Sequence, residues 1–195
     1  VAGANRVLTI DLHAGQIQGF FDIPLDHLYA VGVFIEYFKK LKLKNIVVVS
    51  PDVGGIKMAR AYAKRFGADL AIIDKRRISP EKAEAIHILG DVKNKNAIIV
   101  DDLIATGGSL MEAVSALKKA YAKDIYAAIT HGVLSGDAIK NIDSCKDLKQ
   151  LVITDTIPLD DSKRHPRIKV VTVAPLLGEA IRRIHFEESI SALFD

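Results

Sequence analysis

The chain has 195 residues, and 49% of them are hydrophobic, which supports a sizeable core and excludes a chain that is disordered throughout. Lys and Arg (27) exceed Asp and Glu (24) by three charges, and no basic stripe with interleaved aromatic residues occurs, so nucleic-acid binding is not expected. The single cysteine, Cys145, excludes a disulfide framework and fits a reducing, cytoplasmic location, and no apolar run approaches the roughly 18 residues of a membrane span.

Short β-branched runs alternate with amphipathic stretches along the chain. Seven runs are typical of strands: residues 6–11, 45–50, 70–74, 97–101, 124–130, 151–154 and 168–173. Four stretches between them are typical of helices: residues 29–42, 55–66, 109–121 and 175–185. Most of the runs are apolar throughout, as parallel strands buried on both faces are. The pattern therefore predicts an α/β fold with a mostly parallel, twisted sheet and helices on both faces. The charged residues 75–85, which include Pro80, are predicted to form a long loop.

The fourth run carries the clearest functional pattern, because residues 97–109 read AIIVDDLIATGGS. Asp101 and Asp102 end the strand, and small residues then lead into a helix that begins near Ser109. Free backbone N–H groups and the positive end of the helix dipole make such a turn a phosphate cradle. Two carboxylates beside it suit ribose hydroxyls or a Mg²⁺-bound ligand. The alternative is an ordinary turn in which Ser109 caps the helix and the aspartates are solvated.

Several motifs resemble the ribose-phosphate pyrophosphokinase family. AIIVDDLIATGGS is similar to the ribose-phosphate loop of the phosphoribosyltransferase-type fold, and residues 11–30, DLHAGQIQGFFDIPLDHLYA, are similar to the signature of the family. SPDVGG (50–55), DKRR (74–77), THGVLSGDA (130–138), DTIP (155–158) and EAIRRIH (179–185) extend the resemblance over the whole chain. It implies a phosphoribosyltransferase-type fold and transfer of the β,γ-pyrophosphoryl group of Mg·ATP to the anomeric hydroxyl of ribose 5-phosphate, in nucleotide biosynthesis.

The resemblance also implies roles for individual residues. His13, Asp52 and Asp11 are expected to hold Mg²⁺, and His13 is expected to contact ATP, whose other contacts would lie upstream of residue 1. Lys75 and Arg77 would place positive charge at the reacting phosphates. The expected ribose 5-phosphate ligands are Arg77, Asp101, Asp102, Ala105, Thr106, Gly107, Gly108 and Ser109. Many family members have an acidic residue where this chain has Ala105, but a backbone amide binds phosphate equally well from alanine.

Family resemblance further implies two similar halves. Residues 1–28 would end the first half, residues 29–174 would form the ribose-phosphate-binding half, and residues 175–195 would pack back on the first. The chain begins without Met and almost directly in a strand-like run, so we expect it to be part of a longer polypeptide. The resemblance also implies a homo-oligomer, a dimer or a hexamer. Three alternatives stay open: a phosphoribosyltransferase that uses the same loop, a catalytically silent regulatory homologue, and an inactive fragment.

Overall fold

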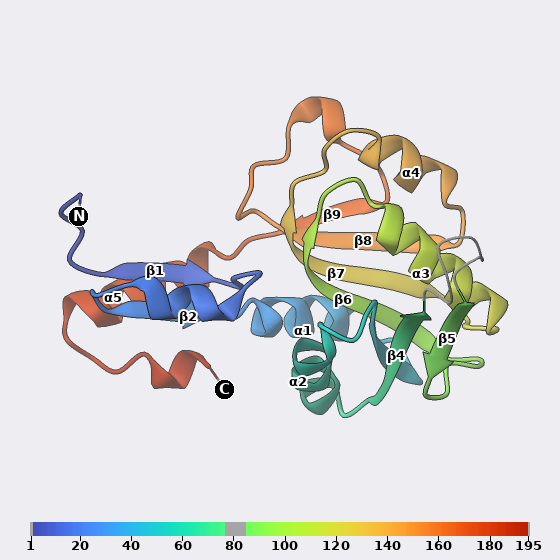
Figure 1. Ribbon diagram of the computed structural model, residues 1–195, viewed down its shortest axis with the longest axis horizontal. Coiled ribbons are helices and arrows are strands. Elements are labelled where there is room, and N and C mark those ends of the chain that lie inside the picture. The colour runs from blue at the N-terminus through green and yellow to red at the C-terminus, as the bar shows by residue number, and fades with distance from the viewer. Residues whose placement is uncertain (1, 77–84, 195) are drawn as a thin grey trace.

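The computed structural model describes residues 2–76 and 85–194, which form a seven-stranded main sheet and a two-stranded small sheet (Figure 1). The order of the main sheet is β5-β4-β3-β6-β7-β8-β9. Its neighbouring strands run parallel, except that β5 is antiparallel to β4 at one edge. The main-sheet strands are β3 (Ile46–Ser50), β4 (Asp69–Arg76), β5 (Ala85–Leu89), β6 (Asn96–Ile104), β7 (Ile125–Gly132), β8 (Leu148–Thr154) and β9 (Ile168–Val171).

Helices cover both faces of the main sheet, because successive strand residues point to opposite sides. Val48 and Ile98 pack into a core with two of the helices, and Val47 and Ile99 pack into a second core on the other face. The helices are α1 (Val31–Lys40) and α2 (Ile56–Phe66) on one face, and α3 (Gly108–Lys119) and α4 (Ala138–Ser144) on the other. This arrangement leaves the carboxyl ends of the strands open to ligands.

A small sheet lies beside the main sheet. Its two parallel strands are β1 (Val7–Ile10) and β2 (Leu25–Leu28), joined through the 3-10 helix η1 (Gly15–Phe20). Figure 1 shows the last helix, α5 (Ala174–His185), next to these strands. Segments from the beginning and the end of the chain therefore make up one layer.

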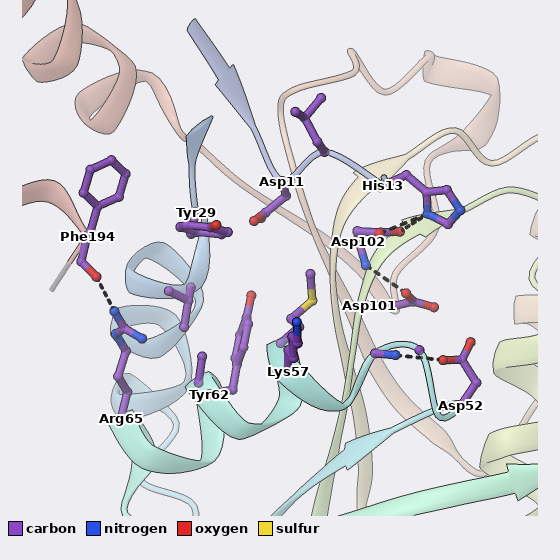
Figure 2. Close-up of a pocket in the computed structure, with 16 residues that line it drawn as sticks. Asp11, His13, Tyr29, Asp52, Lys57, Tyr62, Arg65, Asp101, Asp102 and Phe194 are labelled. Carbon is purple, nitrogen blue, oxygen red and sulfur yellow. Dashed lines mark hydrogen bonds and ion pairs between the residues drawn. The ribbon is translucent and has the colours of Figure 1, made fainter. Parts of the chain in front are cut away.

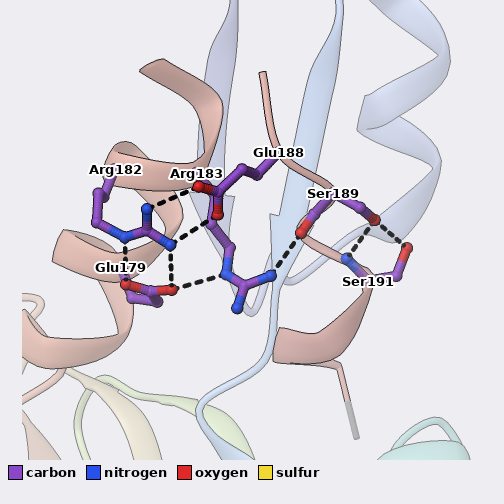
Figure 3. A network of polar contacts seen from close by, with 6 residues as sticks. All are labelled: Glu179, Arg182, Arg183, Glu188, Ser189 and Ser191. Atoms are coloured by element: carbon purple, nitrogen blue, oxygen red, sulfur yellow. Dashed lines mark hydrogen bonds and ion pairs between the residues drawn. The ribbon is translucent and has the colours of Figure 1, made fainter. Parts of the chain in front are cut away.

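Ion pairs fix the chain where it leaves α5 (Figure 3). Arg182 donates to both Glu179 and Glu188, and Arg183 donates to Glu179 and to the carbonyl of Ser189. The two arginines lower the pKa of Glu179 to about 2. The tail then forms the 3-10 turn η3 (Ser191–Leu193), whereas the 3-10 turn η2 (Asp161–Lys163) lies between β8 and β9. Beyond η3, the carbonyl of Phe194 accepts a hydrogen bond of 2.5 Å from Arg65 of α2.

The predicted fold class is confirmed, and each predicted strand and helix corresponds to an element. The prediction of one loop over residues 75–85 is wrong at both ends, since β4 continues to Arg76 and β5 begins at Ala85. The reason is antiparallel pairing, in which Lys75 lies opposite Ile86. The short elements β2, β5 and α4 were not predicted. Among the helices of the described residues, none has both the length and the apolar character that crossing a membrane requires.

Candidate functional site

Two cavities open at the carboxyl ends of the parallel strands, where open α/β folds bind their ligands. The first, of about 700 Å³, lies between the turn after β1 and the beginning of α2 (Figure 2). The second, of about 560 Å³, surrounds the loop between β6 and α3. Asp52 and Asp101 line both cavities. Two carboxylates that the sequence predicted as site residues therefore stand at the boundary between them.

Asp101 is the most strongly perturbed carboxylate at this boundary. Its Oδ1 accepts a hydrogen bond of 2.9 Å from the backbone N–H of Asp102. Burial, with a further contribution from the charges of Asp102 and Asp52, raises the pKa of Asp101 to about 6. The carboxylate therefore gains or loses a proton close to neutral pH. A cation or a hydroxyl donor that enters either cavity would stabilise its charged form.

His13 is brought to Asp102 although 89 residues separate them in sequence. The Nδ1 atom of His13 lies 3.0 Å from both carboxylate oxygens of Asp102 (Figure 2). The His13 side chain is 80% exposed and that of Asp102 only 14%, so the imidazole covers the carboxylate from the solvent side. The hydrogen bond to Asp102 raises the pKa of His13. To ligate a metal the ring must be neutral, so metal binding here would release a proton.

Asp52 lies in the turn between β3 and α2 and lines both cavities. Its Oδ1 accepts a hydrogen bond of 2.9 Å from the N–H of Gly55, and the Ser50 hydroxyl donates to its carbonyl at 2.7 Å. A Cβ at Gly55 would come within 2.7 Å of the Ser50 hydroxyl oxygen, which explains the glycine. The carboxylate is thus oriented by one backbone bond and presented at the mouth of both cavities.

Asp11, the third predicted metal ligand, lies deeper than the other two. It is 4% exposed, and its Oδ2 accepts hydrogen bonds from the N–H of Ala30 (3.0 Å) and the hydroxyl of Thr130 (2.7 Å). Burial raises the pKa of Asp11 despite these bonds. The contact ties the small sheet to the carboxyl end of β7. A role of Asp11 as a metal ligand stays a prediction.

The loop between β6 and α3 has the geometry of an anion cradle. Its carbonyls are held by the protein: those of Ala105, Thr106 and Gly107 accept from Ser135, Asn141 and Met111, respectively. Gly107 has φ +78°, a left-handed conformation that glycine adopts without strain, and α3 begins at the next residue. The first N–H groups of α3 have no partner within the helix and are directed out of its N-terminus. The predicted residues 105–109 line the second cavity.

The roles of the two predicted catalytic cations stay predictions. Lys75 is the penultimate residue of β4, and Arg77 lies outside the described residues. In the part of the chain that is described, no three His, Cys, Asp or Glu side chains converge closely enough to hold a metal ion by themselves. A Mg²⁺ ion here would therefore need oxygen atoms from a bound phosphate, which is how proteins usually bind this ion.

Helix α2 contributes cavity residues that the sequence did not single out. Lys57, Met58, Ala61, Tyr62 and Arg65 line the first cavity, together with Tyr29 and Phe194. The sequence pattern that could have identified them is their i, i+3 and i, i+4 spacing after the turn that contains Asp52, since residues so spaced share one helix face. Figure 2 shows this face below Asp11 and Tyr29.

Comparisons with known proteins identify relatives of this chain. Residues 75–195 match the family model of the phosphoribosyl synthetase-associated domain. Ribose-phosphate pyrophosphokinase of Oceanobacillus iheyensis is 53% identical over 194 residues, and that of Clostridium acetobutylicum is 51% identical over 195. These alignments cover 100% and 99% of this chain but only 61% of each relative, so the chain spans about three fifths of their length.

Solved structures give the same relationship. Phosphoribosylpyrophosphate synthetase from Mycobacterium smegmatis superposes with a TM-score of 0.87 at 39% identity, over 95% of this chain and 60% of that one. Adenine phosphoribosyltransferase from Trypanosoma brucei, at 15% identity and a TM-score of 0.50, shares the fold, over 76% of this chain and 74% of that one. Fold and loop together define a protein of the phosphoribosyltransferase type. Within that class, the chain belongs to the ribose-phosphate pyrophosphokinase family.

Proposed function

We propose that this chain carries the ribose 5-phosphate side of a ribose-phosphate diphosphokinase site. In the proposed reaction the anomeric oxygen of ribose 5-phosphate attacks the β-phosphorus of ATP, the bond from that phosphorus to the α,β-bridging oxygen breaks, and AMP leaves. The products are phosphoribosyl pyrophosphate, AMP and the proton of the anomeric hydroxyl. The observation that carries the proposal is the pair of cavities that share Asp52 and Asp101, because two substrates must meet at one boundary.

In this proposal the second cavity takes ribose 5-phosphate. The 5-phosphate would lie against the N-terminus of α3 and residues 105–109, where backbone N–H groups favour an anion. Asp101, which lines both cavities, would accept hydrogen bonds from ribose hydroxyls and be charged once a donor compensates its burial, and Asp102 would assist from the first cavity, which it lines. Ala105 is compatible with this role, since a backbone N–H donates to phosphate whatever side chain the residue carries.

The first cavity would take the phosphates of Mg·ATP. Asp52 and His13 present one oxygen-bearing and one nitrogen-bearing side chain at its mouth, a set that suits Mg²⁺ only when it is shared with phosphate oxygens. When bound, Mg²⁺ would neutralise phosphate charge. The side chains of this chain would orient the two substrates. Lys75 and Arg77 would place positive charge where negative charge develops on the reacting phosphates.

Two further proposals concern the whole protein. We infer that residues 1–28 and 175–195 belong to one half and residues 29–174 to the other, which the position of α5 beside the small sheet supports. We also infer a homo-oligomer, a dimer or a hexamer, that works in the cytoplasm. Because the chain spans about 61% of its relatives, the nucleotide side of the site is expected to need residues beyond it.

Calorimetry with ribose 5-phosphate tests the proposal directly. The chain should bind ribose 5-phosphate, should bind ribose without phosphate more weakly, and should bind ATP less tightly than ribose 5-phosphate. Asp101→Asn should weaken ribose 5-phosphate binding, whereas Asp22→Asn, at an exposed position, should not. Absence of ribose 5-phosphate binding would contradict the proposal, and tight ATP binding by this chain alone would contradict the assignment of the nucleotide side.

A reaction assay separates the alternatives. Formation of AMP from ATP and ribose 5-phosphate identifies the diphosphokinase. Consumption of phosphoribosyl pyrophosphate with a nucleobase, without AMP release from ATP, identifies a phosphoribosyltransferase. Ribose 5-phosphate binding with neither reaction is the result expected of a silent homologue or of a chain that needs residues beyond these 195 for turnover.

A further inference from the structure

The ring of His131 links the end of β7 to the turn that carries His13. Its Nε2 lies 3.2 Å from the carbonyl oxygen of Ile10 and 3.0 Å from that of Asp11. Carbonyl oxygens only accept hydrogen bonds, so Nε2 must carry the proton. A single N–H therefore holds the last carbonyl of β1 and the next one, immediately before the chain turns toward His13.

A threonine hydroxyl on the other side of the ring gives Nδ1 a partner. Nδ1 lies 2.9 Å from the hydroxyl oxygen of Thr156. The Thr156 hydroxyl can donate either to Nδ1 or to the carbonyl of Thr130, 3.2 Å away, and because Nε2 carries the ring proton, the neutral Nδ1 takes the acceptor role. In the neutral ring, Nδ1 accepts and Nε2 donates, and each ring nitrogen has a partner.

The turn that this ring holds is conformationally unusual. Asp11 has φ +41°, in the left-handed region that aspartate adopts more readily than most side chains do. Its carboxylate is fixed by Ala30 and Thr130, and its carbonyl by His131. The next N–H, that of Leu12, donates to Nε2 of His27 at 2.9 Å. Hydrogen bonds thus hold both the side chain and the backbone at the turn of Asp11 and Leu12.

We propose that His131 is a positioning residue, which holds the turn at Asp11 so that the His13 ring lies over Asp102. His13 is only two residues beyond the held carbonyl and is itself 80% exposed on its side chain, so few other contacts determine where it lies. The consequence for catalysis, alignment of a group that contacts Mg·ATP, rests on the proposed function. The positioning itself does not depend on it.

Substitution of His131 tests the proposal by NMR of the His13 ring. His131→Leu removes both ring bonds, whereas His131→Gln keeps a terminal N–H that reaches the same carbonyls. His131→Leu should move the His13 ring signals and weaken the cross-relaxation between that ring and Asp102, and His131→Gln should restore both. His87→Leu, at an exposed position on the edge strand β5, is the control and should leave the His13 signals in place.

Two outcomes would overturn the proposal: unchanged His13 signals in His131→Leu, or displaced signals that His131→Gln does not restore. If His131→Leu does not fold, His131→Phe serves instead, because it keeps a ring of similar size and removes the N–H that holds the Ile10 and Asp11 carbonyls, and unchanged His13 signals would then be decisive against the proposal. Affinity for ribose 5-phosphate, measured on the same variants, should stay within about twofold of the wild type. A wild-type chain that fails to bind ribose 5-phosphate would contradict the proposed function and leave the NMR test readable.

Discussion

Replacing Asp101 by Asn should make the chain more stable at neutral and basic pH. Burial holds the pKa of Asp101 near 6 in the folded chain, against an ordinary value of 3.8. The folded chain therefore binds the proton more tightly than the unfolded chain. The stabilisation that the protonated Asp101 carboxyl gives the folded chain is fully present below about pH 4, and it is lost as the pH rises through 6. At about 1.4 kcal/mol for each pH unit between the two values, the charged carboxylate costs the folded chain about 3 kcal/mol at pH 8.

Urea unfolding of the wild type and Asp101→Asn across this range measures the effect. Asparagine keeps an oxygen that accepts from the N–H of Asp102, so the substitution removes mainly the charge. The variant should gain about 3 kcal/mol at pH 8 and little near pH 4, and Asp22→Asn should show no comparable change. A gain that is equal at both pH values, or a loss at pH 8, would refute the reasoning, since neither follows from a buried carboxylate with a raised pKa.

Two further pairs of substitutions test local features of the structure. Tyr62→Phe should stabilise the chain by about 1 kcal/mol, because the Tyr62 hydroxyl is buried without a hydrogen-bond partner among the described residues. Tyr37→Phe should destabilise it by about 1 kcal/mol, since that hydroxyl donates to Gln150 at 2.7 Å; thermal unfolding compares the two. Gly107→Ala should cost about 1 kcal/mol and weaken ribose 5-phosphate binding, because φ +78° strains any side chain. Gly108→Ala, where the nearest atom to a new Cβ is 3.9 Å away, should be tolerated in both assays.

Each comparison has a result that counts against it. Equal destabilisation in both tyrosine variants would mean that Tyr62 has a partner in solution, such as a bound water. If Gly107→Ala and Gly108→Ala lost affinity alike, the cradle would depend on side-chain size rather than on the left-handed backbone.

The sheet and its helices could be predicted because their signals are local. Strands buried on both faces are apolar throughout, and α2 shows its buried side as Ala59, Tyr62 and Ala63. The elements that escaped prediction have weaker patterns. β2 (LDHL) is a short, partly polar strand, and β5 (AIHIL) is exposed at the edge of the main sheet, where pairing rather than burial defines the strand.

The candidate site was predictable to the level of loops but not of contacts. Asp52 follows β3, and Asp101 lies in the carboxyl-terminal half of the neighbouring parallel strand β6, and the structure brings them to one boundary. Which way Asp11 points could not be read from its neighbours in sequence, because its partners Ala30 and Thr130 come from distant elements. For the same reason the ring of His131 could be recognised as structural only after the fold placed it against β1.

The boundary between the two cavities has a thermodynamic consequence. Because Asp52 and Asp101 belong to both cavities, a ligand in one changes the charge and hydration that a ligand in the other meets. Occupancy of the two cavities must then be coupled, and the coupling free energy is the same whichever ligand binds first. A phosphate-rich ligand and a hydroxyl-rich ligand would each alter the affinity for the other without any movement of the fold. Such cooperativity would follow from the two carboxylates, Asp52 and Asp101, that both ligands share.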